Sequence, residues 1–351
     1  MTESSQVDPI RELLMTYNEL NSSTITVLDE PPSALEFMRF VALNRPFVVR
    51  DFASDWQATS TWSLSHLKST LSSRPVNIAV TPRGNADAPT TNDDGGMIFI
   101  KPWEEMQPFS EFVDYVAHQE RDGRTTDEEV RYAQTRVYYP EPFSFEHQIE
   151  NDNLRNEYSS LFCDVEKDIS FARIALEQEP DAINLWIGNS HSVTSLHKDP
   201  YQNIYVQILG RKHFTLLPPL FHSCINEVPL PSATYARSPS NPSKLGIQLD
   251  TPPSQVPVAT WDPDEPEQRT TEYSHLAQPV RVTLEKGDML YLPALWYHKV
   301  GQSCGDDGVC VAVNYWYDMD FGGSFWPLCN FARNVTLHND GRQKRSTQGS
   351  R

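Results

Sequence analysis

Helical and strand-like patterns of apolar residues alternate along the first part of the chain. Apolar side chains recur at the spacing of one helix face near the N-terminus, and Ser33 with Glu36 fits the capping box that opens a second helix. The predicted helices cover residues 7–20, 33–41, 62–71, 109–118 and most of 146–179, and the predicted strands cover 24–28, 45–50, 76–80 and 137–139. Residues 1–140 are therefore predicted to form a mixed α/β part.

After Pro180 the pattern changes to short β-rich runs separated by turn residues. The runs cover residues 182–187, 203–209, 212–217, 280–284, 289–292 and 309–317. Many short strands with such turns are typical of a sandwich, a barrel or a jelly roll. We therefore predict a mainly β core with flanking helices over residues 141–320, on which residues 1–140 pack.

Two segments interrupt or follow this pattern. Residues 229–267 are rich in proline and serine, which predicts a long insertion loop rather than core. Residues 321–338 contain helically spaced apolar side chains and are predicted to form a C-terminal helix. The polar, basic residues 339–351 are predicted to be a disordered tail.

Composition narrows the classes of function. Hydrophobic residues make up 38% of the 351 residues, enough for a sizeable core. The net charge of −18 disfavours nucleic acid as a partner; it either serves solubility alone or attracts a basic partner. The odd number of cysteines, five, without any C-x-x-C pair argues against a disulfide framework or a structural zinc site. No signal-peptide run or membrane span is evident, so a cytoplasmic or nuclear protein is expected.

One constellation of residues indicates metal chemistry. His197 and Asp199 are two residues apart, so in an extended strand both point to the same face. With the distant His298 they supply two imidazoles and one carboxylate, the facial set that binds Fe(II) and leaves three positions open. A His-x-Asp pair alone is common, and an ordinary surface or core histidine is the alternative.

Further polar residues lie on the same predicted strands. Lys212 follows a Gly-Arg turn and is a candidate to pair with the distal carboxylate of a dicarboxylate; an ordinary lysine at a hairpin edge is the alternative. Thr194 offers a hydroxyl three residues before His197. Asn203 and Asn314 offer amides inside a barrel, although structural hydrogen bonds would explain them equally.

Residues 194–219 (TSLHKDPYQNIYVQILGRKHFTLLPP), residues 287–298 (GDMLYLPALWYH) and the pair Asn314-x-Trp316 resemble the JmjC-domain 2-oxoglutarate oxygenases. The resemblance is closest to the small JmjC hydroxylases, and it extends from the second predicted helix to about Asp320. It implies a double-stranded β-helix, the cupin-like jelly-roll barrel, with helices packed outside. It also implies Fe(II) as cofactor, 2-oxoglutarate as cosubstrate and O2 as oxidant.

The resemblance assigns roles to individual residues. It gives the iron-ligand positions to His197, Asp199 and His298. Lys212 takes the position that pairs with the distal carboxylate of 2-oxoglutarate, assisted by Thr194 and Tyr139. The positions near the cosubstrate and the metal fall on Asn203, Asn314 and, as an aromatic wall, Trp316.

For the substrate, the resemblance implies a lysine side chain on a GTP-binding protein of the developmentally regulated type. Asp318 and Asp320 are candidates to hold the lysine ammonium, with surface carboxylates as the alternative. The competing functions are histone lysine demethylation, peptidase activity and a non-catalytic cupin-like binding scaffold. A homodimer formed through the C-terminal helix is also compatible with the resemblance.

Overall fold

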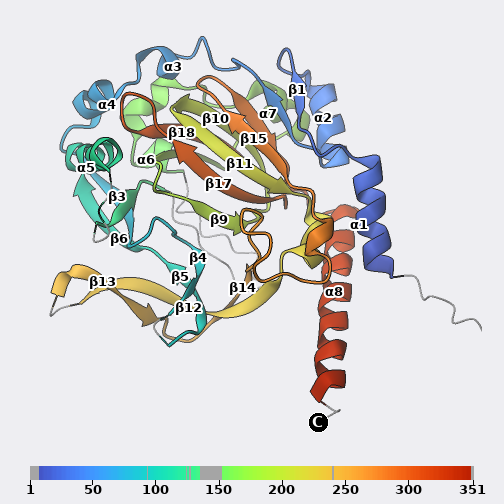
Figure 1. Cartoon of the computed structure of the whole chain (residues 1–351). Coiled ribbons are helices and arrows are strands. Elements are labelled where there is room, and N and C mark those ends of the chain that lie inside the picture. The colour runs from blue at the N-terminus through green and yellow to red at the C-terminus, as the bar shows by residue number, and fades with distance from the viewer. Residues whose placement is uncertain are drawn as a thin grey trace, which may run out of the picture.

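Two facing β-sheets form the centre of the molecule (Figure 1). The computed structural model describes residues 8–92, 94–123, 125, 128–134, 152–238 and 241–348. The six-stranded sheet has the order β1 (Thr26–Leu28), β2 (Phe47–Val49), β16 (Met289–Leu292), β10 (Tyr201–Leu209), β18 (Cys310–Asp318), β8 (Ala182–Gly188). The four-stranded sheet has the order β15 (Val280–Leu284), β11 (Arg211–Leu217), β17 (Tyr297–Ser303), β9 (Thr194–His197). Only the β1–β2 pair is parallel among these strands.

Alternating side chains assign the two faces of the six-stranded sheet. On β10, Ile204 and Val206 belong to the large outer cluster, whereas Tyr205 between them packs with apolar residues of the four-stranded sheet. On β18, Val313 points outward while Ala312 points inward. This period of two follows from the pleat of a strand. The two sheets therefore enclose a jelly-roll barrel, and the predicted fold class is confirmed.

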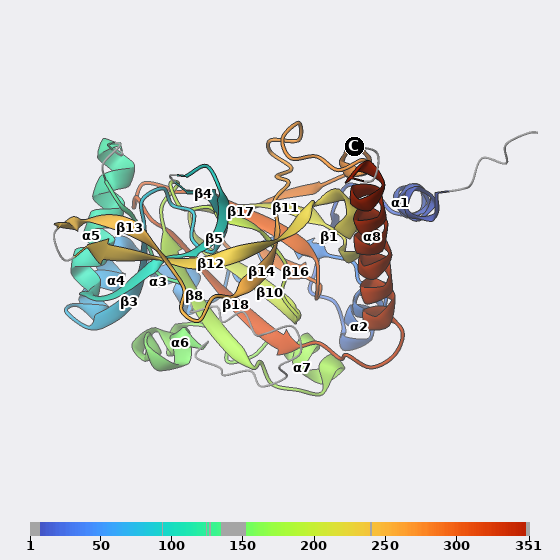
Figure 2. The same cartoon turned by 90° about the horizontal axis from the view of Figure 1, so that it is seen from below.

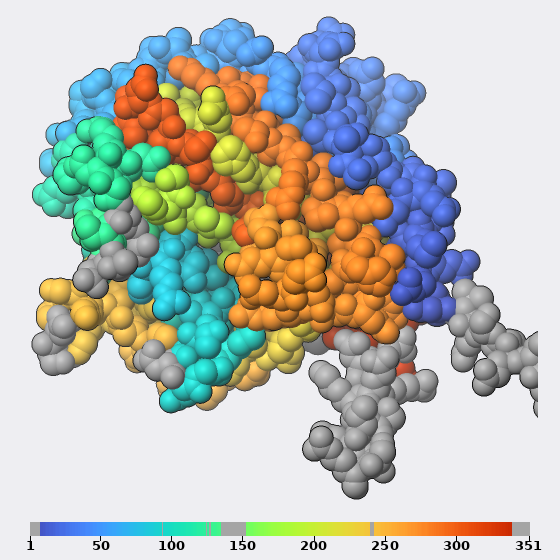
Figure 3. All heavy atoms as spheres, viewed as in Figure 1, coloured from blue at the N-terminus to red at the C-terminus, as the bar shows by residue number. Residues whose placement is uncertain are grey.

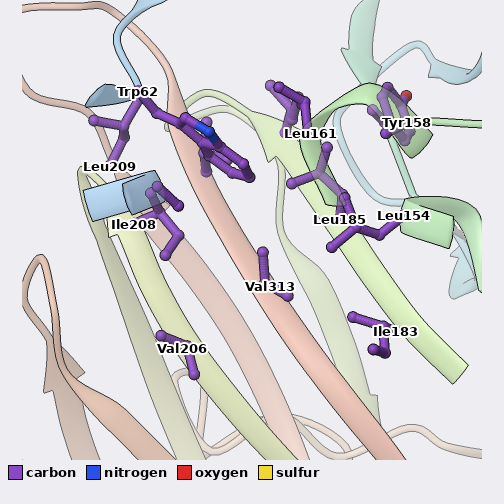
Figure 4. Close-up of a cluster of buried hydrophobic side chains, with 14 of the residues drawn as sticks. Trp62, Leu154, Tyr158, Leu161, Ile183, Leu185, Val206, Ile208, Leu209 and Val313 are labelled. Atoms are coloured by element: carbon purple, nitrogen blue, oxygen red, sulfur yellow. The ribbon is translucent and has the colours of Figure 1, made fainter. Parts of the chain in front are cut away.

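Short helices cover the outer face of the six-stranded sheet. They are α2 (Ala34–Leu43), α3 (Gln57–Thr61), α6 (Asn153–Asn156), η1 (Ser159–Asp164) and α7 (Ser170–Leu176). Beside them, α4 (Leu64–Leu71) packs on α5 (Phe109–Asp122), which lies against residues 75–81 and 103–108. Figure 4 shows Trp62, Leu154 and Leu161 packing towards Leu185 and Val313 of the sheet. The capping box predicted for the second helix is present, since Ser33 accepts from the Glu36 amide and Glu36 accepts from the Ser33 amide.

A three-stranded sheet lies beside the barrel. Its order is β6 (Trp103–Pro108), β3 (Pro75–Thr81), β7 (Val130–Tyr132). Ala133, just after β7, forms a bridge to Ile187 of β8. This bridge brings the end of β7 against the barrel wall, which matters for the site described below.

The proline- and serine-rich segment is not a loop. It forms β12 (Glu227–Ser238), β13 (Asn241–Leu249) and β14 (Gln255–Ala259), and β12 also pairs with β5 (Met97–Lys101), which pairs with β4 (Ala88–Thr91). Figure 1 shows these strands below the barrel, and Figure 2, viewed from below, shows them in front of it. The loop prediction failed because Pro229 lies opposite Pro257 and neither proline has an N–H that the ladder would leave unpaired, while Leu230 and Val258 are buried. Between β14 and β15, a segment containing η3 (Ser274–Leu276) lies on the surface between α1 and the β4–β5 hairpin (Figure 3).

Two helices mark the chain ends. α1 (Pro9–Leu20) packs through Ile10 and Leu14 onto η2 (Pro219–Cys224), where α8 (Phe325–Gln348) also packs (Figure 1). The prediction of a disordered tail is wrong for residues 339–348, because α8 continues through them. Its Arg, Lys and Gln residues are good helix formers, so polarity alone does not end the helix. All five cysteines are free, and no helix in the described ranges is long and apolar enough to cross a membrane.

Candidate metal centre

The three predicted metal ligands converge at one end of the four-stranded sheet. β9 and β17 pair with His197 directly opposite His298, and Asp199 follows β9 by two residues. The Asp199 Oδ2 atom lies 3.5 Å from the Nε2 atom of each histidine, and the three ligand atoms lie within 4.8 Å of one another. The Leu295 amide donates to the Asp199 carbonyl at 2.8 Å, which ties the chain after β9 to the chain before β17.

Backbone carbonyls orient both imidazoles. His197 Nδ1 lies 2.8 Å from the Ser195 carbonyl, and His298 Nδ1 lies 3.0 Å from the Trp296 carbonyl. Because a carbonyl only accepts, each Nδ1 carries the proton, and each neutral ring then presents an Nε2 lone pair towards Asp199. Two lone pairs and a carboxylate aimed at one point repel one another unless a cation lies between them. The donor set therefore fits a divalent metal such as Fe(II).

The three ionisable groups of the triad shift one another's pKa values. Burial alone would raise the pKa of Asp199, but the two neighbouring imidazoles, His197 above all, outweigh burial and hold that pKa well below its ordinary value. Burial would also lower the pKa of His197, but Asp199 raises it above its ordinary value. Burial and the neighbouring His197 lower the pKa of His298. The carboxylate thus stays ionised at neutral pH, as metal binding requires.

Lys212 of β11 supplies a cation to the same pocket. Its side chain is only 2% exposed, and its Nζ donates to the Tyr132 hydroxyl at 2.8 Å. Within the described ranges no carboxylate lies within ion-pair distance of Lys212. A buried ammonium without an anion is costly, and the distal carboxylate of 2-oxoglutarate would neutralise it. The site therefore fits this cosubstrate.

A chain of hydrogen bonds crosses the inner face of the six-stranded sheet. Trp186 Nε1 donates to Asn314 Oδ1 at 2.9 Å, and Asn314 Nδ2 donates to Asn203 Oδ1 at 3.0 Å. The Asn203 side chain is thereby oriented with its own amide hydrogens still available to the pocket. Beside it, the Trp316 ring stacks on Tyr201 with centroids 4.7 Å apart and parallel planes, so it forms a rigid wall.

These residues line one pocket with about 660 Å³ of empty space, partly open to solvent. Of the residues predicted for the site, the pocket contains His197, Asp199, His298, Lys212, Thr194, Asn203, Asn314 and Trp316. Tyr139 lies outside the described residues, so its assignment stays a prediction. Asp318 and Asp320 are exposed at and beyond the end of β18 and do not line the pocket.

Sequence reasoning missed three polar residues of this pocket: Tyr132, Gln134 and Asp87. Tyr132 makes the contact to Lys212, and Gln134 donates to Asp87 Oδ2 at 3.2 Å. Tyr132 and Gln134 are two residues apart and share a face of an extended segment, but no local sequence pattern indicates that this face meets the pocket. The Asp87 carboxylate is partly enclosed, and burial raises its pKa to about 6 against the opposing effects of Gln134 and His197.

Comparisons with known proteins agree with this geometry. A family model described as a cupin-like domain matches residues 32–323. The human protein named bifunctional peptidase and (3S)-lysyl hydroxylase JMJD7 is 37% identical over 299 residues, covering 85% of each chain. The Arabidopsis thaliana protein named lysine-specific demethylase JMJ32 is 34% identical over 324 residues, covering 89% of this chain and 87% of its own. The Dictyostelium discoideum JmjC domain-containing protein E is 32% identical over 311 residues, covering 84% of each chain.

Proposed function

The chain belongs to the cupin-like JmjC family, and from that premise we propose that it is an Fe(II)- and 2-oxoglutarate-dependent protein hydroxylase acting on a lysine side chain. One observation carries the proposal: the facial triad lines the same pocket as the buried Lys212, which forms no ion pair with any carboxylate of the described residues. Either feature alone has ordinary explanations. Together they match the needs of a metal and a dicarboxylate bound side by side.

Each residue of the pocket has a distinct role in this proposal. His197 and His298 would hold the metal through imidazole nitrogens, and Asp199 would hold it through a carboxylate oxygen. Once bound, Fe(II) and 2-oxoglutarate supply the oxidation of a C–H bond by O2, with release of succinate and CO2. Lys212 pairs with the distal carboxylate, and Tyr132 and Thr194 fix the orientation of that end of the cosubstrate.

The side of the pocket formed by the six-stranded sheet serves the substrate. Trp316, held by its stack on Tyr201, gives a flat apolar surface along which an aliphatic side chain packs. Asn203 and Asn314 are fixed by their mutual hydrogen bond, so neither reorganises when the pocket fills. This wall also excludes water from the reacting carbon, which protects the oxidising centre from side reactions.

Lysine as the target rests on two supports. The relative with 37% identity has lysyl hydroxylase in its name, and the net charge of −18 favours a basic segment as substrate. The sequence resemblance adds a GTP-binding protein of the developmentally regulated type as the proposed partner. A cytoplasmic or nuclear location and a homodimer remain parts of the same proposal.

Demethylation and peptide cleavage are the alternatives. One relative has peptidase in its name and another has demethylase, and each covers most of the chain. Purified Fe(II)-loaded protein would be incubated with lysine-containing peptides from basic segments, in unmethylated and methylated forms. Hydroxylation adds one oxygen to an unmethylated peptide with equal succinate, whereas demethylation releases formaldehyde and cleavage gives fragments. If wild type and His197→Ala consume 2-oxoglutarate equally, a non-catalytic scaffold is the better reading.

A further inference from the structure

Asp87 is a carboxylate of the pocket that has no part in the proposed binding of iron or cosubstrate. It lies in the connection between β3 and β4, and among the described residues that line the pocket only Asp87 and Asp199 are acidic. Gln134 donates to Oδ2, while Oδ1 has no hydrogen-bond partner within the part of the chain that the structure describes. One carboxylate oxygen is thus left for a ligand entering the pocket.

The connection that carries Asp87 is fixed against the metal-bearing strand. Gly84 donates to Thr81 Oγ1 at 2.8 Å, and its carbonyl accepts from the Val193 amide at 2.9 Å, one residue before β9. A Cβ atom on Gly84 would lie 1.9 Å from the His191 carbonyl oxygen, and φ is +77°, so only glycine allows this close approach. Asp87 is therefore held in place before any ligand binds.

The position of Asp87 relative to the cosubstrate anchor follows from β7. Tyr132, which bonds Lys212, and Gln134, which bonds Asp87, are two residues apart on an extended segment. Side chains two apart lie on the same face and are separated by about 6.6 Å along the strand. The segment from Tyr132 to Gln134 therefore orients both Lys212, which pairs with the cosubstrate, and Asp87. The two contacts lie at neighbouring but separate positions.

Charge balance then indicates what Asp87 binds. Fe(II), the Asp199 carboxylate, the 2-oxoglutarate dianion and the Lys212 ammonium together carry no net charge. The ionised Asp87 adds one negative charge in a partly enclosed site, where an unbalanced charge is unfavourable. A single positive charge on the incoming substrate side chain restores neutrality.

We propose that Asp87, oriented by Gln134, receives the cationic end of the substrate side chain and makes the site selective for a lysine. This inference rests on the proposed function and deepens it, since it names the residue that recognises the substrate. Asp318, the carboxylate that the sequence suggested for this task, is exposed and outside the pocket lining. Neutralising Asp87 and neutralising Asp318 should therefore give opposite results in a single experiment.

The experiment compares wild type with Asp87→Asn, which keeps the shape and removes the charge. Each protein is given a lysine peptide that wild type hydroxylates and the same peptide with norleucine, which ends in a neutral methyl group. Wild type should prefer lysine in kcat/KM by about tenfold or more, the effect of one charge-assisted hydrogen bond. Asp87→Asn should lose most of that preference while its KM for 2-oxoglutarate stays within about twofold of wild type.

Two matched variants control this result. Asp94→Asn makes the same charge change on the exposed turn between β4 and β5, and it should keep the wild-type preference. Asp318→Asn should also keep it. The inference is overturned if Asp318→Asn loses the lysine preference and Asp87→Asn does not. It is equally overturned if Asp87→Asn instead weakens metal or 2-oxoglutarate binding without changing the ratio between the peptides.

A binding measurement separates this inference from the proposed function. Protein loaded with Mn(II) and 2-oxoglutarate is mixed with n-pentylammonium or 1-pentanol, and relaxation of the probe protons reports binding near the metal. Wild type should bind the ammonium more tightly than the alcohol, and Asp87→Asn should not. That outcome supports Asp87 as the cation site even if no lysine peptide is hydroxylated. Equal binding of the ammonium by wild type and Asp87→Asn contradicts it.

Discussion

Replacing Lys212 with methionine should stabilise the empty protein and abolish cosubstrate binding. The Lys212 ammonium is 2% exposed and has one hydrogen-bond acceptor, Tyr132, in the described part of the chain. Leaving buried donors without partners costs about 1–3 kcal/mol each, partly offset by water in the pocket. Methionine has a similar length and no charge, so the unfolding free energy of the empty protein should rise by about 1–2 kcal/mol.

Loss of the cation should have the opposite effect on the cosubstrate. Truncating one partner of a buried charge pair costs about 2–5 kcal/mol of binding, so the Kd of 2-oxoglutarate should rise by at least about 30-fold. Calorimetric titration of 2-oxoglutarate and thermal unfolding of metal-free protein measure the two quantities. The melting temperature should increase by about 1–3 °C in a chain of 351 residues.

The control is Lys68→Met, which breaks an exposed ion pair to Asp114 at 2.7 Å. It should change the unfolding free energy by less than about 1 kcal/mol and leave 2-oxoglutarate binding unaltered. The reasoning is refuted if Lys212→Met lowers the melting temperature of the empty protein and binds 2-oxoglutarate like wild type. Lys212 would then be a structural lysine of the hairpin.

Three further predictions concern other contacts. Tyr132→Phe removes the acceptor of Lys212 and should raise the KM for 2-oxoglutarate about three- to tenfold, and a parallel Tyr139→Phe variant tests the sequence-based assignment. Arg237→Gln removes the bonds that anchor β12 to Glu105 (3.0 Å) and Glu129 (2.8 and 3.0 Å), so urea unfolding should show a loss of about 1–2 kcal/mol. Burial would raise the pKa of Glu227, but His222 and Arg333 lower it from 4.5 to about 2. Because that pKa is depressed, Glu227 contributes stability above pH 4.5 that is lost as pH falls towards 2. The unfolding free energies of wild type and Glu227→Gln should therefore differ by up to about 3 kcal/mol at pH 6 and converge near pH 2.

The parts of the site that follow from local rules could be predicted. His197 and Asp199 share a face because they are two residues apart near a strand, and the short β-rich runs separated by turn residues indicate a sandwich, a barrel or a jelly roll. The meeting of His298 with His197 is different, because the pairing of β9 with β17 joins residues about a hundred positions apart. No local pattern specifies that pairing; only the resemblance to a family supplied it.

The remaining differences have physical causes. Tyr132 and Gln134 reach the pocket because the end of β7 bridges to β8, a contact that sequence alone does not reveal. Proline content indicated a loop at residues 229–267, whereas paired prolines on β12 and β14 leave no donor unsatisfied. Polarity indicated disorder after residue 338, although a polar helix with good formers continues to Gln348.

We propose that this chain inserts an oxygen atom from O2 into a lysine side chain, using the metal held by His197, Asp199 and His298. The most direct measurement incubates a lysine peptide with the Fe(II)-loaded protein, 2-oxoglutarate and O2 labelled with oxygen-18, and locates the label by fragmentation mass spectrometry. The account predicts one labelled oxygen on a lysine side-chain carbon, equal amounts of succinate, and neither product with Asp199→Ala. Formaldehyde from a methylated peptide, cleavage of the chain, or labelled product from Asp199→Ala would contradict it.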